Sequence, residues 1–137
     1  MSVLGKLLRT YLSGRPNYAT TIPGGISPEI AAVGVEQPHI IYQGISRTRD
    51  MLLSNVPAVY TERIQLLVIA DTRSEAQTVS DWIVASVQAT PARQTIDGIQ
   101  IHLLRVDDEI DSSELAIDGS DEQTRVTTID VIGVYQN

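Results

Sequence analysis

The chain of 137 residues contains no cysteine. Disulfide bonds, thiolate metal sites and a cysteine nucleophile are therefore excluded, and the lack of cysteine suits a reducing compartment. No apolar run approaches the roughly 18 residues that a membrane-spanning helix needs, so we expect no membrane partner. At this length the simplest organisation is one domain, residues 1–137, with a core of its own.

Phenylalanine is also absent, and aromatic residues make up only 4% of the chain. Basic residues are few and scattered, and the formal net charge is −7. Tight nucleic-acid binding depends largely on cations that displace phosphate counterions, so this charge disfavours it. Isoleucine, valine, leucine and threonine are plentiful instead, and they favour β-strands.

The clearest pattern in the sequence lies in residues 60–89. A near-continuous run of large or β-branched apolar residues predicts a buried strand. Thr72 with Glu75, and Ser74 with Gln77, have the spacing of a capping box and predict the start of a helix. The apolar residues of this helix recur at spacings of three and four, which predicts one face that covers a sheet. They are Ala76, Val79, Trp82, Ile83 and Val87.

The other elements follow from the same kinds of pattern. A helix is predicted over residues 3–13, and strands are predicted over residues 39–47, 99–106 and 125–135, with Gly44 marking a bulge. Residues 15–38 hold most of the turn formers and predict an irregular connecting segment, with at most one helical turn at residues 28–33. The order α-β-β-α-β-β predicts an α+β fold: a mainly antiparallel sheet of about four strands with two helices packed on one face.

The sequence holds no recognisable catalytic set. His39 and His102 lie in separate predicted strands without metal-ligand spacing, so we expect solvated or hydrogen-bonded histidines. No serine lies in a nucleophile elbow, and no nucleotide fingerprint follows a strand. Residues 23–27 lack the lysine of a phosphate loop and predict a turn. We therefore predict a protein that is not an enzyme and has neither a cofactor nor a metal site.

Residues 107–122 predict an acidic loop, which is the best candidate for a site. Clustered carboxylates can hold calcium, although the residue pattern of a calcium-binding loop is missing. The simplest interpretation is a solvated loop. A third use is repulsion, because carboxylates that line a channel keep DNA phosphates away from its wall. Composition alone leaves the three alternatives open.

Residues 48–59 form the predicted tip of a hairpin and are unusually apolar for a connection. The large apolar residues are Met51, Leu52, Leu53 and Val56. They either pack against their own domain or form a protruding arm that contacts another subunit, because loops that expose several large apolar side chains usually mark contacts.

Four stretches together resemble the tail terminator, or tail completion, proteins of long-tailed bacteriophages and prophages. The stretches are Pro38-His39-Ile40-Ile41-Tyr42-Gln43-Gly44-Ile45-Ser46, Glu62-Arg63-Ile64-Gln65-Leu66 leading into Ser74-Glu75-Ala76, Arg105-Val106-Asp107-Asp108-Glu109, and Arg125 through Asp130 to Tyr135. Their order and spacing match over roughly residues 38–135, and the N-terminal helix fits too. No single motif is diagnostic, and residues 17–37 depart from the usual linker of the family.

The resemblance implies a structural virion protein that is assembled in the host cytoplasm. Members of the family form a ring, commonly of six subunits, on the last disc of the tail tube. The ring stops tube growth and joins the tube to head-side neck proteins, while DNA passes through without specific binding. It implies that the apolar hairpin tip contacts a neighbouring subunit or the tube. It also implies that four acidic residues lie near the lumen or a subunit edge: Asp107, Asp108, Glu109 and Asp111.

Two alternatives remain at the level of sequence. The nearer one is a head-to-tail adaptor or neck ring protein of similar size. The farther one is a small cytoplasmic α+β domain of ferredoxin-like build, which binds a small ligand or calcium through the acidic loop.

Overall fold

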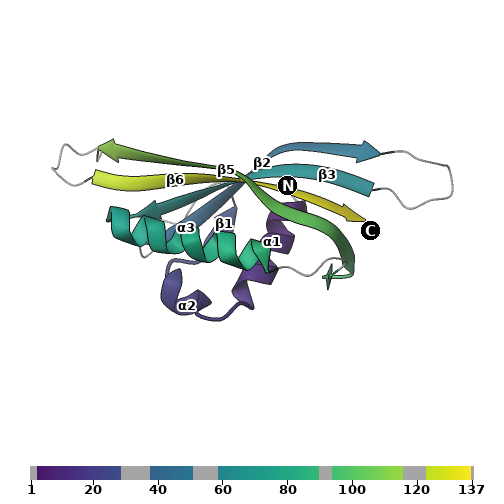
Figure 1. Ribbon diagram of the computed structural model, residues 1–137, viewed down its shortest axis with the longest axis horizontal. Helices are drawn as coiled ribbons and strands as arrows, with labels where there is room; N and C mark the ends of the chain where they lie inside the picture. Colours follow the sequence, from purple (N-terminus) through teal and green to yellow (C-terminus); the bar gives the residue numbers. More distant parts are fainter. Residues whose placement is uncertain (1–2, 29–37, 51–58, 90–93, 116–122, 137) are drawn as a thin grey trace.

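The computed structural model of the protein describes residues 3–28, 38–50, 59–89, 94–115 and 123–136 (Figure 1). Within these ranges it contains three helices and six strands. The helices are α1 (Val3–Ser13), α2 (Tyr18–Thr21) and α3 (Arg73–Gln88). The strands are β1 (Ile26–Pro28), β2 (His39–Asp50), β3 (Val59–Ala70), β4 (Thr95–Ile96), β5 (Ile99–Leu115) and β6 (Gln123–Gln136).

The strands form one sheet in the order β1-β2-β3-β6-β5-β4. The predicted α+β class is confirmed, and the pairs β2–β3, β3–β6, β6–β5 and β5–β4 are antiparallel. The predicted count of about four strands is wrong, because short strands lie at both edges, and β1 pairs with β2 in parallel. Strands of two and three residues are too short to produce a hydrophobic period, so the sequence pattern could not reveal them.

Part of the predicted irregular segment is regular. Residues 15–38 contain the single-turn helix α2 and the edge strand β1, whose Ile26 lies opposite Ile40 of β2. Asn17, the residue before α2, has a left-handed backbone (φ 66°). Of the predicted helical turn at residues 28–33, Pro28 is the last residue of β1, and the rest lies outside the described residues.

The helices lie on one face of the sheet (Figure 1). Along β3 every second side chain from Glu62 to Ala70 is buried, and this alternation turns one side of the strand toward the helices. The predicted face of α3 is largely correct, because Ala76, Val79, Ile83 and Val87 are buried. Trp82 is only partly buried, and its Nε1 donates a hydrogen bond to the Pro16 carbonyl oxygen (3.0 Å).

Hydrogen bonds stabilise the start of α3 and the packing of α1 on the core. Thr72 is the N-cap of α3, and its Oγ1 accepts a hydrogen bond from the Glu75 backbone N–H (3.1 Å), as the capping-box spacing predicts. The α1 helix packs its leucines into the core beside α3, and Tyr11 donates its hydroxyl hydrogen to the Ser86 carbonyl oxygen (2.8 Å). The described part of the chain contains no helix long and apolar enough to cross a membrane.

The strands of the two long hairpins extend further than the sequence predicts. The β2 strand continues to Asp50 and contains the predicted bulge, because its register to β3 shifts between Gly44 and Ser46. The β5 strand continues through the acidic stretch to Leu115, so the prediction of a loop beginning at Asp107 is wrong. Pairing with β6 satisfies the backbone there, and an edge strand can keep charged side chains in solvent on both faces.

Candidate assembly surface

The uncovered face of the sheet is a candidate site. The side chains of β2, β3, β6 and β5 that alternate with the core residues point away from α1, α2 and α3, and no described element packs on them (Figure 1). Strand pairing brings these side chains into rows across the sheet, since residues directly opposite each other share a face.

One end of this face is apolar. Ile41 lies opposite Leu67, and both are partly exposed, whereas Ile69 lies opposite Val126, which is buried. Ile110 continues this group onto β5, where 54% of its surface is exposed. Antiparallel sheets commonly carry polar residues on a solvated face, so partly exposed aliphatic rows favour a surface that meets another molecule.

A charged band crosses the middle of the same face. The Arg63 guanidinium lies 3.0 Å from an Asp107 carboxylate oxygen and 3.8 Å from an Asp130 oxygen. Arg105 lies 3.8 Å from the other Asp107 oxygen. Exposed pairs of this kind stabilise a fold by about 1 kcal/mol or less each. Their main effect here is to place two cations among the carboxylates, so that the band has both signs of charge.

The structure places the predicted acidic residues on one strand but on two faces. Asp107, Asp108 and Glu109 are exposed residues of β5, and Asp111 lies opposite Thr127 of β6. Asp108 is in register with Asp130 on the uncovered face, whereas Glu109 is in register with the buried Ile129. The alternation of a strand therefore separates carboxylates that a loop could have gathered. In the described ranges, no three His, Asp or Glu residues lie close enough to hold a metal ion.

The predicted apolar tip, Met51, Leu52, Leu53 and Val56, lies outside the described residues. The strands that lead to it are described, and they remain paired up to Asp50 opposite Val59. This end of β2 and β3 projects beyond the helix layer, while the far end of β5 and β6 projects in the opposite direction (Figure 1). The end of β2 and β3 is therefore a β-hairpin arm, whereas α3 lies along the other end of β5 and β6 (Figure 1).

A buried polar cluster at the base of the β2–β3 arm was missed by the sequence analysis. Glu62 is only 3% exposed, and its Oε1 accepts hydrogen bonds from the Tyr135 hydroxyl (2.9 Å) and the Leu4 backbone N–H (3.2 Å). Burial, and then the hydrogen bond and negative charge of Glu62, raise the pKa of Tyr135 to about 12. The sequence did indicate this position, because Glu62 lies two and four residues before the core residues Ile64 and Leu66 and therefore shares their face of β3.

The aromatic part of this cluster carries two arginines. The Tyr60 and Tyr135 rings stack with centroids 5.4 Å apart. The guanidinium carbons of Arg47 and Arg49 lie 5.0 and 6.0 Å from the centroid of Tyr60, within the range of cation–π attraction. These contacts hold both arginines on the same side of β2.

The two histidines are placed apart, as expected. His102 lies in β5 with its Nε2 2.9 Å from Oε1 of Gln136, which agrees with the prediction of a hydrogen-bonded strand histidine. His39 begins β2 and is 7% exposed.

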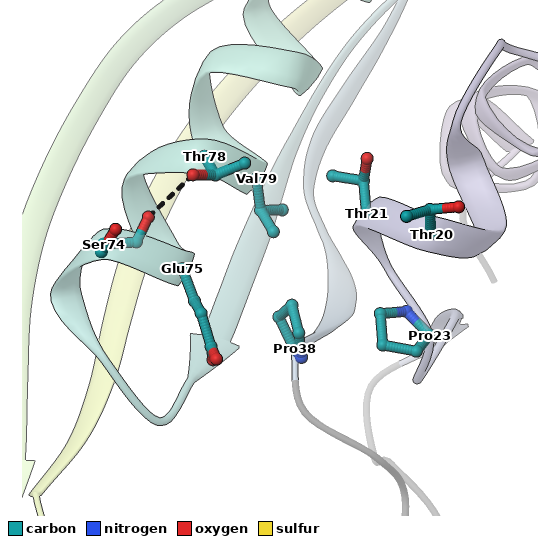
Figure 2. Close-up of a pocket in the computed structure, with 8 residues that line it drawn as sticks. All are labelled: Thr20, Thr21, Pro23, Pro38, Ser74, Glu75, Thr78 and Val79. Atoms are coloured by element: carbon teal, nitrogen blue, oxygen red, sulfur yellow. Dashed lines mark hydrogen bonds between the residues drawn. The ribbon is translucent and has the colours of Figure 1, made fainter.

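A pocket of about 430 Å³ lies between α2 and the first turns of α3 (Figure 2). Among the described residues that line it, Glu75 is the one titratable residue, and Thr78 Oγ1 donates to the Ser74 carbonyl oxygen (2.9 Å). One carboxylate among hydroxyls and proline rings does not form a nucleophile–base pair. The lining residues are Thr20, Thr21, Pro23, Pro38, Ser74, Glu75, Thr78 and Val79.

Comparison with known proteins gives a structural neighbour but no matching family model or curated protein. No protein-family model matches the chain, and no curated protein matches its sequence. Among solved structures, the fold is similar to a chain in a structure described as the virion of native gene transfer agent (GTA) particle. The TM-score is 0.67 at 9% sequence identity, and the match covers 96% of this chain and 94% of the other. At this identity the likeness establishes a shared fold over nearly the whole of both chains.

Proposed function

We propose that this chain is a structural protein of a phage-like virion. The observation that carries the proposal is the likeness of fold to a chain of the GTA virion, which extends over 96% of this chain. Because the match covers almost all of both chains, it supports a similar role more strongly than a match to one shared motif would.

Within the virion, we propose the position of a tail terminator. The family resemblance over residues 38–135 supports this position. In it, copies of the chain form a ring on the last disc of the tail tube, stop its growth and join it to head-side neck proteins. The β2–β3 arm is suited to reach a neighbouring subunit or the tube, because its strands project past the helix layer (Figure 1).

The electrostatics support a ring through which DNA passes. The net charge of −7 disfavours retention of a polyanion. The arginines of the uncovered face, Arg63 and Arg105, are paired with Asp107 and Asp130, so their charge is already offset within the subunit. A surface with net negative charge and paired arginines has little attraction for DNA phosphates, and this property suits the wall of a DNA channel.

The proposal is tested by electron microscopy of the purified protein mixed with tail tubes. We expect a ring of density at one end of each tube, and tubes that no longer lengthen when tube protein is added. Protein unfolded by heat and then cooled serves as the control. Binding to head or neck particles, with bare tubes, would assign the protein to the adaptor position instead.

Binding to neither particle would contradict a virion role. The calcium-binding alternative then predicts a rise in melting temperature on addition of calcium, because a ligand that binds only the folded state stabilises it.

A further inference from the structure

At both edges of the sheet, a long stretch of the described residues has a described strand neighbour on one side only. The β2 strand pairs with β1 only at residues 40–42, so residues 43–50 have a described partner on one side only. The β5 strand pairs with β4 only at Ile99 and Gln100, so residues 102–115 are in the same position. We call these stretches the β2 edge and the β5 edge. Such edges present N–H and C=O groups that can pair with another chain. The Glu109 N–H is not among them, because it donates to Asp108 Oδ1 (2.8 Å).

The exposed apolar side chains gather on the same two strands. Ile45, Leu103 and Ile110 are the large hydrophobic residues that are exposed in the described part of the chain, at 52%, 45% and 54%. Ile45 belongs to the β2 edge, and Leu103 and Ile110 belong to the β5 edge. Exposed apolar residues that are scattered singly need no explanation, but their confinement to two free edges indicates contact surfaces.

The two edges carry opposite charge. The β2 edge contains Arg47, Arg49 and one acidic residue, Asp50, so its net charge is positive. Tyr60 holds both guanidinium groups on one side of the sheet. The β5 edge contains Asp108 and Glu109 within a stretch of five acidic residues and one arginine. Glu109 is in register with the buried Ile129, and Arg47 is in register with the buried Glu62, so both belong to the helix-covered side. In a sheet continued from one copy to the next, opposite charges on the same side would meet.

The strand directions also agree. The β2, β3, β6 and β5 strands are successively antiparallel, so β2 and β5 run in opposite directions. A second copy placed beside the first in the same orientation therefore brings its β2 antiparallel to β5. Because β1 and β4 cover opposite ends of the two edges, the copies must meet with a stagger along the strands. Contact between two different surfaces of identical chains generates a ring when the rotation closes.

We propose that copies of this chain join head to tail by antiparallel pairing of the β2 edge of one copy with the β5 edge of the next, with Arg47 and Arg49 facing the acidic stretch of β5. The proposal deepens the proposed function, since it assigns the contact between the subunits of the ring.

Cross-linking provides the first test, because the native chain has no cysteine. In the double variant Thr48→Cys/Asp108→Cys, the two thiols lie on opposite edges of one subunit, so a short bismaleimide can join them only between copies, and Arg47, Arg49 and Glu109 stay in place. We expect a ladder of cross-linked oligomers in concentrated protein or in protein mixed with tail tubes. The control Thr48→Cys/Lys6→Cys places one thiol on the exposed side of α1 and should give no ladder beyond dimers. No ladder under either condition, or equal ladders from both variants, would overturn the proposal.

Charge exchange provides the second test. We expect Arg47→Glu/Arg49→Glu and Glu109→Lys each to weaken self-association about tenfold or more, since like charges then face each other on the helix-covered side. A mixture of the two variants should restore association. In the mixture, the β2 edge with glutamates can pair with the β5 edge with lysine, and the two unchanged edges can pair with each other. Circular dichroism establishes that each variant is folded. Two folded variants that associate like the native chain, or a mixture that stays dissociated, would contradict the proposal.

The two proposals fail in different ways. A ladder without capped tubes would retain the edge contact and reject the tail-terminator role. Capped tubes without a ladder would retain the role and reject the edge contact.

Discussion

Tyr135 donates its phenolic hydrogen to the buried carboxylate of Glu62, with 2.9 Å between the two oxygens. The same Oε1 of Glu62 accepts the backbone N–H of Leu4 in the first turn of α1. One carboxylate oxygen of β3 therefore ties the beginning of α1 to the end of β6.

Replacement of the carboxylate should destabilise the subunit. Glu62→Ala leaves the Tyr135 hydroxyl and the Leu4 N–H without this acceptor, and an unsatisfied buried group costs about 1–3 kcal/mol. The measurement is the free energy of unfolding in urea. Glu62→Gln keeps an acceptor oxygen and should lose less, and Gln77→Ala on the exposed side of α3 is the matched control. An unchanged midpoint for Glu62→Ala would show that the junction does not stabilise the fold.

Stability should fall in alkaline solution through Tyr135. Its pKa is raised from 10.0 to about 12 in the folded chain, so folding favours the neutral phenol. The corresponding stabilisation is fully present below pH 10 and is lost as the pH rises toward 12. Chemical unfolding at several pH values measures it. Tyr135→Phe lowers stability at neutral pH and removes this component, so its curve should be flatter between pH 10 and 12 than that of the native chain. Parallel curves would contradict the assignment.

Gly133 should not tolerate a side chain. A Cβ added there would lie 2.6 Å from Cδ1 and 2.9 Å from Cδ2 of Leu4, which is fully buried. We expect Gly133→Ala to cost about 1–3 kcal/mol through overpacking. Gly14→Ala is the control, since its nearest neighbour is the Tyr11 carbonyl oxygen at 3.7 Å. In the double variant Gly133→Ala/Leu4→Ala the crowding is relieved, so its cost should be smaller than the sum of the two single costs.

The apolar tip of the β2–β3 arm should be needed for assembly but not for folding. We expect Leu52→Asp/Leu53→Asp to leave a folded subunit that no longer caps tail tubes, because a buried apolar contact with another subunit or the tube would then receive charges. The readouts are circular dichroism and electron microscopy of tube ends. Ala19→Asp on the exposed side of α2 is a control that should cap normally. A double variant that still caps tubes would refute the arm hypothesis.

Much of the fold could be predicted from the sequence because long elements produce a period. The β3 strand was predicted from a near-continuous apolar run, of which the structure buries every second side chain from Glu62 to Ala70. The α3 helix was predicted from spacings of three and four that the structure largely reproduces in its buried face. The short strands β1 and β4 have no period and depend on pairing with residues distant in sequence. The end of β5 was predicted to be a loop, because its charges resemble those of a solvated turn, and only its pairing with β6 makes it a strand.

The candidate surface was less predictable for a related reason. Asp107 was identified as a site residue, but its partner Arg63 lies 44 positions away and was not identified. Glu62 likewise was read as one residue of a family stretch, although its parity with Ile64 placed it in the core. Charge patterns along the sequence indicate which residues are polar, whereas strand register decides which of them meet.

The position of β6 has a consequence for how the subunit is made. It is the last strand along the chain, yet it lies between β3 and β5 in the middle of the sheet. Until residues 123–136 have left the ribosome, β3 and β5 have no strand to join them, and their apolar edges stay open to other chains. The sheet is therefore complete only after synthesis of these residues. A chain truncated before residue 123 should aggregate and not fold into a smaller subunit.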